Sequence, residues 1–373
     1  MGKHKIALIS GNMESHDGLH RVVSILCNEL SETYDVYLIC FWGDKSIYPI
    51  KENVRQFYVH HEEKRLRYVL CSRVKKLRKF LKSEKVDIVF CEAMTPVLET
   101  FLATRGLPVK FIFHEHSSSG FRLRKQNKSQ KQRLHTWFLQ QIINRFTDGI
   151  IVLTEKEAEV YTNRYFVPME KIHVLYNFLE EKLIDESVQY DETSRALITV
   201  GRIEYQKGFE YLVEVARKVF ARHPDWHWDI YGEGEEWYTE QIRDLIAKNK
   251  LEDHVFLKGT QANLYDVYPQ YSLYVMTSRY EGLPMVLLEA KAKELPIVSF
   301  DIHAGPSDII RDSVDGYLVS SFDTDAMADK ICYLIEYPEV RKDFSDHAYG
   351  NIDKFRKETI MAKWKDLIDG MME

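Results

Sequence analysis

The amino-acid sequence predicts an α/β protein built around two parallel β-sheets. Short apolar segments alternate with longer ones whose apolar residues recur at helical spacing, which is the pattern of βα units. With 373 residues, the chain has the length of two domains of ordinary size, each large enough to bury its own core. A polar stretch at residues 180–194 divides the pattern into two series and is the expected linker.

The predicted strands define two domains. The first half contains apolar strand candidates at residues 5–10, 36–41, 54–59, 86–91, 109–114, 149–154 and 172–176. The second half contains them at residues 196–200, 226–231, 254–259, 273–277, 297–301 and 316–319. We therefore expect a first domain at residues 1–178 and a second at 179–351, followed by a tail with regularly placed apolar residues.

Composition favours a folded cytoplasmic protein. Hydrophobic residues make up 45% of the chain, yet no apolar run approaches the ~18 residues that a membrane-spanning helix needs. The amino terminus runs directly into a strand and lacks a signal-peptide core. The five cysteines have no C-x-x-C spacing, so we expect reduced thiols, mostly in the core.

A loop with two cations follows the predicted strand at 196–200. It reads Gly201-Arg202-Ile203-Glu204-Tyr205-Gln206-Lys207-Gly208, and a helical pattern begins at once after it. Arg202 could grip a diphosphate in a forked geometry while Lys207 supplies a point charge. Surface charges exposed to solvent are the alternative, but this loop lies at the carboxyl end of a strand, where open α/β sheets bind ligands.

A second motif, Glu281-Gly282-Leu283-Pro284-Met285-Val286-Leu287-Leu288-Glu289, follows the predicted strand at 273–277. Pro284 suits the first turn of a helix, and the free N–H groups near residues 282–285 would then form an anion site. Glu289, farther along that helix, can accept hydrogen bonds from hydroxyls. Phosphate at a helix start with hydroxyl acceptors beside it suits a nucleotide-sugar, whereas an exposed loop Glu and an amphipathic-helix Glu are the simpler interpretation.

The two motifs together resemble the donor half of retaining glycosyltransferases of family 4, over roughly residues 195–320. Tyr231-Gly232-Glu233-Gly234 lies between them at the matching position. The resemblance implies the GT-B fold, two facing Rossmann-like domains with a deep interdomain cleft, and a final helix, about residues 352–373, that packs back on the first domain. It places Arg202 and Lys207 on the donor diphosphate, Glu289 on the ribose and Glu281 on the transferred sugar. The remaining donor-binding positions are Gly18, Asn177, Gly201, Gly232, Gly282, Leu283 and Pro284.

The first half matches the family less clearly. Many relatives have paired glycines after the first strand, where this chain has Asp17-Gly18, so Gly18 is either a donor-phosphate contact or only a helix-start glycine. His114, at the carboxyl end of a predicted strand, matches a family histidine near the transferred sugar. Asn177 closes the last strand of the first domain, where relatives also have Asn; a plain turn residue is the alternative.

The sequence gives little reason to expect a metal or other cofactor. We expect His114 and His116 to point apart on their strand, and no third ligand follows at a suitable spacing. Asp323-Thr324-Asp325 resembles the metal-binding D-x-D of other glycosyltransferases, but it precedes a helical pattern, so we expect Asp323 or its neighbour to cap that helix. The GT-B resemblance implies metal-independent transfer.

The resemblance also implies a mechanism. Arg202, Lys207 and the helix start would stabilise the leaving diphosphate. Family members are thought to react by front-face substitution, with the leaving phosphate helping to deprotonate the acceptor hydroxyl. The candidate catalytic residues are then His114, Glu281, Arg202 and Lys207, with Glu281 orienting the sugar rather than attacking it.

Charge is distributed unevenly between the halves. Residues 1–175 hold 28 Lys plus Arg against 19 Asp plus Glu, a net of +9, although the whole chain has −6. The cations concentrate at residues 64–85, a basic amphipathic helix, and at 121–146. A solvated face is the simple interpretation, and nucleic acid lacks a recognition motif. Family members with lipid-linked acceptors dock through this domain, so we expect an anionic membrane to meet a face comprising Arg73, Lys75, Lys76, Arg78, Lys79, Arg122, Arg124 and Lys125.

The expected function is sugar transfer from a nucleotide-sugar to a glycan or lipid-linked acceptor, in bacterial surface-polysaccharide assembly on the inner face of the membrane. UDP is the commonest donor nucleotide among relatives, but no residue here selects the base, the sugar or the acceptor. Two alternatives stay open: a nucleotide-sugar 2-epimerase, which would need no basic face, and a non-catalytic nucleotide-sugar-binding subunit. A Rossmann dehydrogenase is disfavoured because its glycine fingerprint is missing.

Overall fold

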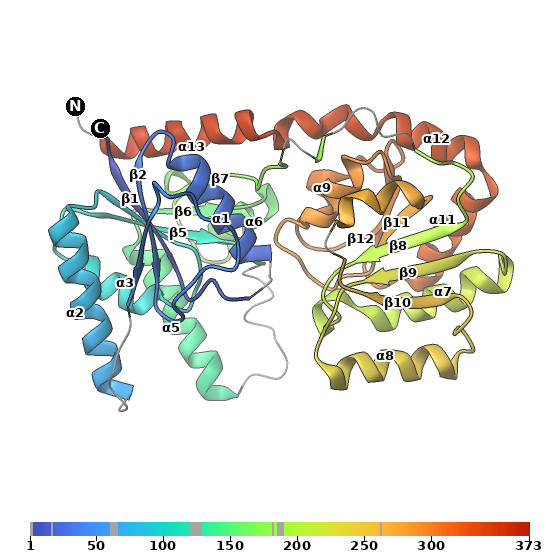
Figure 1. Cartoon of the computed structure of the whole chain (residues 1–373), viewed down its shortest axis with the longest axis horizontal. Helices are drawn as coiled ribbons and strands as arrows, with labels where there is room; N and C mark the ends of the chain where they lie inside the picture. The colour runs from blue at the N-terminus through green and yellow to red at the C-terminus, as the bar shows by residue number, and fades with distance from the viewer. Residues whose placement is uncertain are drawn as a thin grey trace. The chain divides into compact units, whose positions relative to one another are not determined.

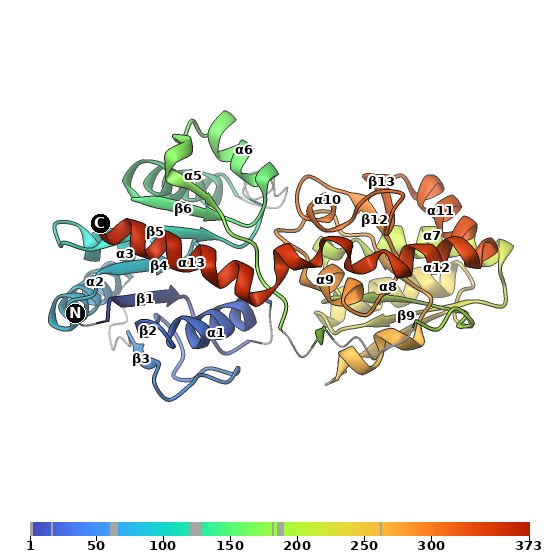
Figure 2. The same ribbon diagram turned by 90° about the horizontal axis from the view of Figure 1, so that it is seen from above.

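The computed structural model describes residues 3–15, 18–59, 66–118, 129–180, 183–184, 190–261 and 263–373. The chain divides into two compact units. Unit 1 comprises Met1–Tyr176 together with Met361–Glu373, and unit 2 comprises Asn177–Ile360. Each unit has one parallel sheet with helices on its faces (Figures 1 and 2).

Unit 1 contains a seven-stranded parallel sheet in the order β3-β2-β1-β4-β5-β6-β7. Its strands are β1 (Lys5–Ser10), β2 (Asp35–Cys40), β3 (Arg55–Tyr58), β4 (Ile88–Cys91), β5 (Lys110–Glu115), β6 (Gly149–Val152) and β7 (Ile172–Val174). Its helices are α1 (Gly18–Leu30), α2 (Leu66–Glu84), α3 (Val97–Thr104), α5 (Gln130–Phe146), α6 (Glu155–Asn163), η1 (Met169–Lys171) and most of α13 (Lys357–Met372). The order reverses between β1 and β4, and ligands of doubly wound sheets bind at the carboxyl ends beside such a reversal.

Alternation along the strands assigns the two faces of this sheet. Val89, Cys91 and Phe113 pack in one core with apolar residues of α2, α3, α5 and α6. Their neighbours point to the opposite face. There Phe90 meets Trp364 of α13, with ring centroids 5.3 Å apart. The last helix therefore belongs to the core of unit 1, although it is the end of the chain (Figure 1).

Unit 2 repeats the arrangement with six parallel strands in the order β10-β9-β8-β11-β12-β13. The strands are β8 (Ala196–Val200), β9 (His227–Tyr231), β10 (Val255–Gly259), β11 (Leu273–Met276), β12 (Ile297–Asp301) and β13 (Gly316–Ser320). The helices are η3 (Tyr205–Lys207), α7 (Phe209–Arg222), α8 (Glu236–Lys248), η4 (Leu264–Asp266), η5 (Tyr268–Gln270), α9 (Met285–Lys291), α10 (Pro306–Ile309), α11 (Thr324–Glu336), α12 (Pro338–Asp346) and η6 (Ala348–Phe355). Here the order reverses between β8 and β11.

The structure confirms the predicted α/β fold class with two parallel sheets, and every predicted strand is present within a few residues. Two details differ. Pro284 precedes α9 instead of lying in its first turn, and α9 has only seven residues. The end of the expected linker is also packed on the fold instead of being loose. Tyr190 is buried, and its hydroxyl donates to the Ser272 carbonyl at 3.0 Å.

Among the helices that the structure describes, none combines the length and the apolar character that crossing a membrane requires. The five cysteines are free thiols, and all but Cys71 are buried. Core burial, as predicted for most of them, raises the pKa of the Cys40 thiol to about 12, so this thiol is inert at neutral pH.

Candidate functional site

The loop after β8 is fixed by close backbone pairing with the loop after β9. Gly201 N–H donates to the Tyr231 carbonyl, and Ile203 N–H donates to the Glu233 carbonyl, each at 2.9 Å. A Cβ on Gly232 would lie 2.1 Å from the Gly201 oxygen, and Gly232 has a φ of +139°. Only glycine permits this approach, so the Gly232 motif determines where the backbone of Arg202 lies.

A second contact joins the β8 loop to the loop after β11. The turn η3 ends at Gly208, which has a φ of +66°, and a Cβ there would lie 2.3 Å from the Thr277 carbonyl oxygen. Thr277 Oγ1 donates to the Lys207 carbonyl at 3.1 Å. The two loops meet at the reversal point of the sheet, which brings the two predicted motifs together.

Lys207 and Glu281 form an ion pair in this place. Lys207 Nζ lies 2.7 Å from Glu281 Oε1, and Gln206 Nε2 donates to the other carboxylate oxygen at 3.0 Å. Glu281 is 7% exposed, and the Lys207 side chain is 19% exposed. The carboxylate is thus held by two donors from the β8 loop, a pairing that the sequence analysis did not predict.

Arg202 is the exposed cation of the motif. Its guanidinium is half exposed and 3.9 Å from Glu204, so it remains available to a ligand. Arg279, which the sequence analysis did not select, is instead structural: it binds Glu210 through both terminal nitrogens at 2.9 and 3.0 Å and lies over the Tyr205 ring. It braces the turn that carries Lys207.

Glu289 lies inside α9 and is buried at 3% exposure. Tyr268 donates its hydroxyl to Glu289 Oε2 at 3.3 Å. Burial, followed by the charge of Glu289, raises the pKa of Tyr268, so the phenol stays protonated as a donor. Leu283 and Pro284 are buried and Gly282 is half-buried in the turn before α9.

In unit 1, His114 belongs to a buried cluster with Glu92 and His116. Glu92 Oε2 lies 2.8 Å from His114 Nδ1 and 2.7 Å from His116 Nε2. The prediction that the two histidines point apart is wrong, because residues two apart on an extended strand share a face. Glu92 shares that face too, since Cys91 pairs with Phe113 in the register of β4 and β5.

Two of the three side chains in this cluster have shifted pKa values. Burial acts against ionisation of Glu92, but the two histidines lower its pKa to about 2. Burial and the neighbouring His114 lower the pKa of His116 to about 4, so this ring is neutral at pH 7. The three side chains offer ligand atoms within 4.8 Å of one another, so the cluster has the donors for a metal ion as well as for a hydrogen-bond network.

Three other predicted positions are placed by the structure. Asp323 caps α11 by accepting from Ala326 N–H at 2.9 Å, so the predicted capping role is confirmed. Asn177 is buried in unit 2. Gly18 starts α1, and a Cβ there would meet nothing within 4 Å, so packing does not explain this glycine.

The basic face of unit 1 is smaller than predicted. Arg73 is a correction: it lies at helical spacing between Val69 and Leu77, points inward, and is buried 3.4 Å from Glu99 with its guanidinium over Trp42. Arg78 is half-buried and donates to the Ala103 and Arg105 carbonyls. Lys75, Lys76 and Lys79 are exposed, and Arg122, Arg124 and Lys125 lie outside the described residues.

Helix α5 adds a feature that the sequence analysis missed. Leu134, Trp137 and Phe138 are 65%, 52% and 47% exposed and lie three and four residues apart on one helical face. Lys131 and Arg133 flank them, and α5 contains no Asp or Glu. We call Leu134, Trp137 and Phe138 the α5 ridge. Leu134, Trp137 and Phe138 recur at helical spacing in the sequence itself, so this signal could have revealed the ridge.

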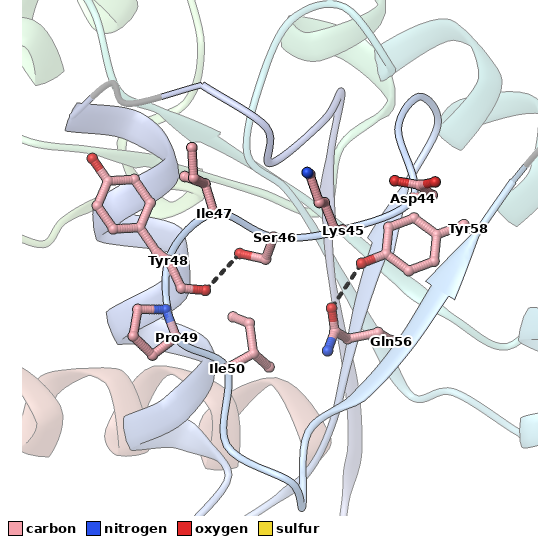
Figure 3. A pocket seen from close by; sticks show the side chains of 9 residues that line it. All are labelled: Asp44, Lys45, Ser46, Ile47, Tyr48, Pro49, Ile50, Gln56 and Tyr58. Carbon is pink, nitrogen blue, oxygen red and sulfur yellow. Dashed lines mark hydrogen bonds between the residues drawn. The ribbon is translucent and has the colours of Figure 1, made fainter.

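Unit 1 also has an open hollow of about 460 Å³ beside the β2–β3 loop (Figure 3). It is lined by Asp44, Lys45, Ser46, Ile47, Tyr48, Pro49, Ile50, Gln56 and Tyr58. Several of its polar groups bond one another: Ser46 donates to the Tyr48 carbonyl at 2.8 Å, and Tyr58 donates to Gln56 at 2.7 Å. We assign this hollow no part in the reaction.

Comparison with known proteins identifies the family. The model of glycosyltransferase family 4 matches residues 16–182, and the model of glycosyl transferases group 1 matches residues 180–351. These matches meet at the end of unit 1 and together include both motifs of unit 2. The chain belongs to the GT-B glycosyltransferases.

Relatives and solved structures agree with this membership. A poly(ribitol-phosphate) α-N-acetylglucosaminyltransferase of Staphylococcus aureus is 28% identical over 91% of this chain and 69% of its own length. A Campylobacter jejuni α-1,4-N-acetyl-D-galactosaminyltransferase, named for a diNAcBac-PP-undecaprenol acceptor, is 26% identical over 98% of each chain. The crystal structure of TarM has the same fold, with a TM-score of 0.82, 18% identity and 98% coverage of each chain. This GT-B glycosyltransferase thus has the fold that the motifs of its second half predicted.

Proposed function

We propose that this glycosyltransferase transfers a sugar from a nucleotide-sugar, with UDP as the nucleotide, to a glycan or lipid-linked acceptor, and that the anomeric configuration is retained without a metal ion. The observation that carries the proposal is the Lys207–Glu281 pair at the reversal point of the sheet in unit 2. In this pair a cation suited to phosphate contacts a carboxylate suited to sugar hydroxyls, which supports the proposal for a chain of the family that transfers sugars.

The residues of unit 2 divide the work on the donor. Lys207 and the half-exposed Arg202 bind the diphosphate and stabilise its charge as the anomeric C–O bond breaks. Glu281 orients the sugar through its hydroxyls, and Glu289, held by Tyr268, accepts from the ribose. The backbone N–H groups of Gly282, Leu283 and Met285 add donors beside the phosphate.

The reaction is a substitution on the face from which the diphosphate leaves. The bond from the anomeric carbon to the acceptor oxygen forms on this side, and the acceptor proton passes to the departing phosphate oxygen. The phosphate thus acts as the base, and no protein carboxylate needs to attack the sugar. His114 hydrogen-bonds a hydroxyl of the transferred sugar.

The names of relatives support the nucleotide, the acceptor and the stereochemistry. Both relatives above are named for α-linked products, which retention gives from an α-linked nucleotide-sugar. A further structure of Staphylococcus aureus TarM contains UDP. Poly(ribitol phosphate) and an undecaprenol-linked glycan are bacterial surface or carrier-linked polymers, so we infer an acceptor of this kind.

We also infer that unit 1 docks on the anionic inner face of the cell membrane. Lys75, Lys76 and Lys79 of α2 are exposed, and each lysine near an anionic surface contributes about 1 kcal/mol. The α5 ridge adds Trp and Phe, side chains that favour the membrane interface. A lipid-linked acceptor would be reached from this position.

The test measures nucleoside diphosphate release from UDP-, GDP-, ADP- and dTDP-sugars in EDTA, with and without liposomes carrying lipid-linked acceptors. We expect release from one UDP-sugar and stimulation by the acceptor. Lys207→Ala should lower kcat/KM about 10²–10³-fold, since a donor to the leaving group is lost. Lys248→Ala, an exposed lysine of α8, is the matched control and should leave the rate unchanged. Tight donor binding with no release under any acceptor would contradict the proposal and indicate a binding subunit.

A further inference from the structure

The cluster at the carboxyl ends of β4 and β5 contains a residue that no donor motif includes, Glu92. Its side chain is fully buried beside His114, and its backbone N–H donates to the Ile9 carbonyl of β1 at 2.9 Å. Glu92 therefore lies at the reversal point of the sheet in unit 1, where ligands of such folds bind. Burying a carboxylate in a core costs free energy, so the position of Glu92 needs a physical reason.

We propose that Glu92 is a positioning residue for His114: it holds the ring through Nδ1, fixes the tautomer that carries its proton there, and leaves Nε2 to accept a hydrogen bond from a substrate hydroxyl. The inference rests on the proposed function, in which His114 contacts the transferred sugar. Glu92 itself touches no substrate.

The hydrogen bonds define the tautomer. One oxygen of Glu92, Oε2, is bonded to both histidines, at 2.8 and 2.7 Å. An ionised carboxylate only accepts, so each histidine must donate, His114 through Nδ1–H. A neutral His114 then has its lone pair on Nε2. The tautomer proposed here therefore pairs Nε2 with a hydrogen donor, and sugar hydroxyls are donors.

The ring of His114 is also held by packing. The His116 ring lies at a centroid distance of 3.9 Å, and Trp364 of α13 meets His114 edge-on at 5.4 Å. Within the described part of the chain, His114 Nε2 is buried and has no hydrogen-bond partner. Such an unpaired buried atom costs free energy, which a bound hydroxyl would recover. The same three side chains could instead bind a divalent cation, and the test separates the two occupants.

The experiment compares Glu92→Gln with the wild-type full chain. The amide keeps the shape but removes the negative charge, and its neutral carbonyl oxygen is a weaker acceptor than the carboxylate oxygen that takes both histidine hydrogen bonds. We expect kcat to fall about 10–100-fold, the cost typical of a lost outer-shell partner, with the donor KM changed less than about 3-fold. Glu115→Gln is the matched control: Glu115 is buried next to His114 at the end of β5, and its carboxylate accepts from the hydroxyls of Tyr161 and Ser117. Its kcat should stay near wild type.

A second measurement does not depend on turnover. Histidine ¹⁵N NMR of the wild type, assigned with His114→Asn, should show His114 protonated at Nδ1, and Glu92→Gln should change that signature. Protonation at Nε2 in the wild type would overturn the inference even if Glu92→Gln failed to fold. Wild-type kinetics in Glu92→Gln, with His114→Ala inactive, would overturn it while leaving the proposed function intact.

Two further outcomes count against it. A fully active His114→Ala would remove the role of His114, and Glu92 would then have nothing to position; donor release by the wild type would still support glycosyl transfer. Stoichiometric zinc in the purified protein, lost in Glu92→Gln, would assign the cluster to a metal.

Discussion

Among single residues, Gly232 is needed for backbone geometry. Its missing side chain lets the loop that carries Arg202 approach the loop after β9. A Cβ would overlap the Gly201 carbonyl oxygen at 2.1 Å, and the φ of +139° disfavours any side chain. Gly232 thus fixes the backbone at Arg202 through its lack of a side chain.

We predict that Gly232→Ala destabilises unit 2 by about 2–4 kcal/mol, because clash and backbone strain add. Thermal unfolding of the full chain should show a clearly lowered transition, and donor affinity should fall with it. Gly370→Ala is the control: it lies in α13 with nothing within 4 Å of its Cβ and should change stability by no more than about 1 kcal/mol. Equal unfolding of Gly232→Ala and the wild type would contradict this explanation.

Residue-scale inference from the sequence succeeded in part. The motifs selected Lys207 and Glu281, but their mutual ion pair depends on β8 and β11 being neighbours in the sheet, although they are some 75 residues apart in the chain. Glu92 was missed because it belongs to no motif and becomes visible only through the register of β4 and β5. Arg73 was misassigned because a count of cations does not distinguish the faces of a helix, whereas the spacing to Val69 and Leu77 does.

At the scale of secondary-structure elements, α2 and α5 present two complementary kinds of surface. Exposed lysines of α2 supply charge, and the α5 ridge supplies apolar and aromatic side chains. Both helices contribute to the same core on one face of the sheet in unit 1 (Figure 2). An amphipathic surface of this composition is typical of binding in the interface of a bilayer.

We predict that Trp137→Ser weakens sedimentation with anionic liposomes several-fold and that the triple change of Lys75, Lys76 and Lys79 to Glu nearly abolishes it, since charge attracts the unit and the ridge anchors it. Salt should weaken binding of the wild type. Trp237→Ser is the matched control, because Trp237 is 66% exposed in α8 of unit 2 beside the acidic residues Glu235 and Glu236. An equal effect of both tryptophan changes, or liposome binding unaffected by any of them, would contradict the docking face.

Element positions were the part of the fold most open to prediction. Buried parallel strands are apolar throughout, so periodicity and flanking turns located all of them. The exceptions arise where tertiary contacts decide. Pro284 precedes α9, and its ring packs closely on Gly305, where a Cβ would lie only 2.5 Å from the proline ring.

At the scale of the whole molecule, the two units repeat one topology, and the chain returns to the first unit at its end. Trp364 is 2% exposed and contacts both Phe90 and His114. The end of the chain therefore completes the core of unit 1 and braces its candidate catalytic histidine. Only the family resemblance predicted this return, because a helix with scattered apolar residues does not specify which sheet it will cover.

Retention of configuration during sugar transfer is decided by the stereochemistry of the product. The purified full chain would be incubated in EDTA with the UDP-sugar identified by diphosphate release, together with its acceptor, and the anomeric proton of the product followed by ¹H NMR from the first minutes. We expect an α-linked product from an α-linked donor, formed at the same rate with and without EDTA. A β-linked product, or a reaction that stops when the metal is removed, would contradict it.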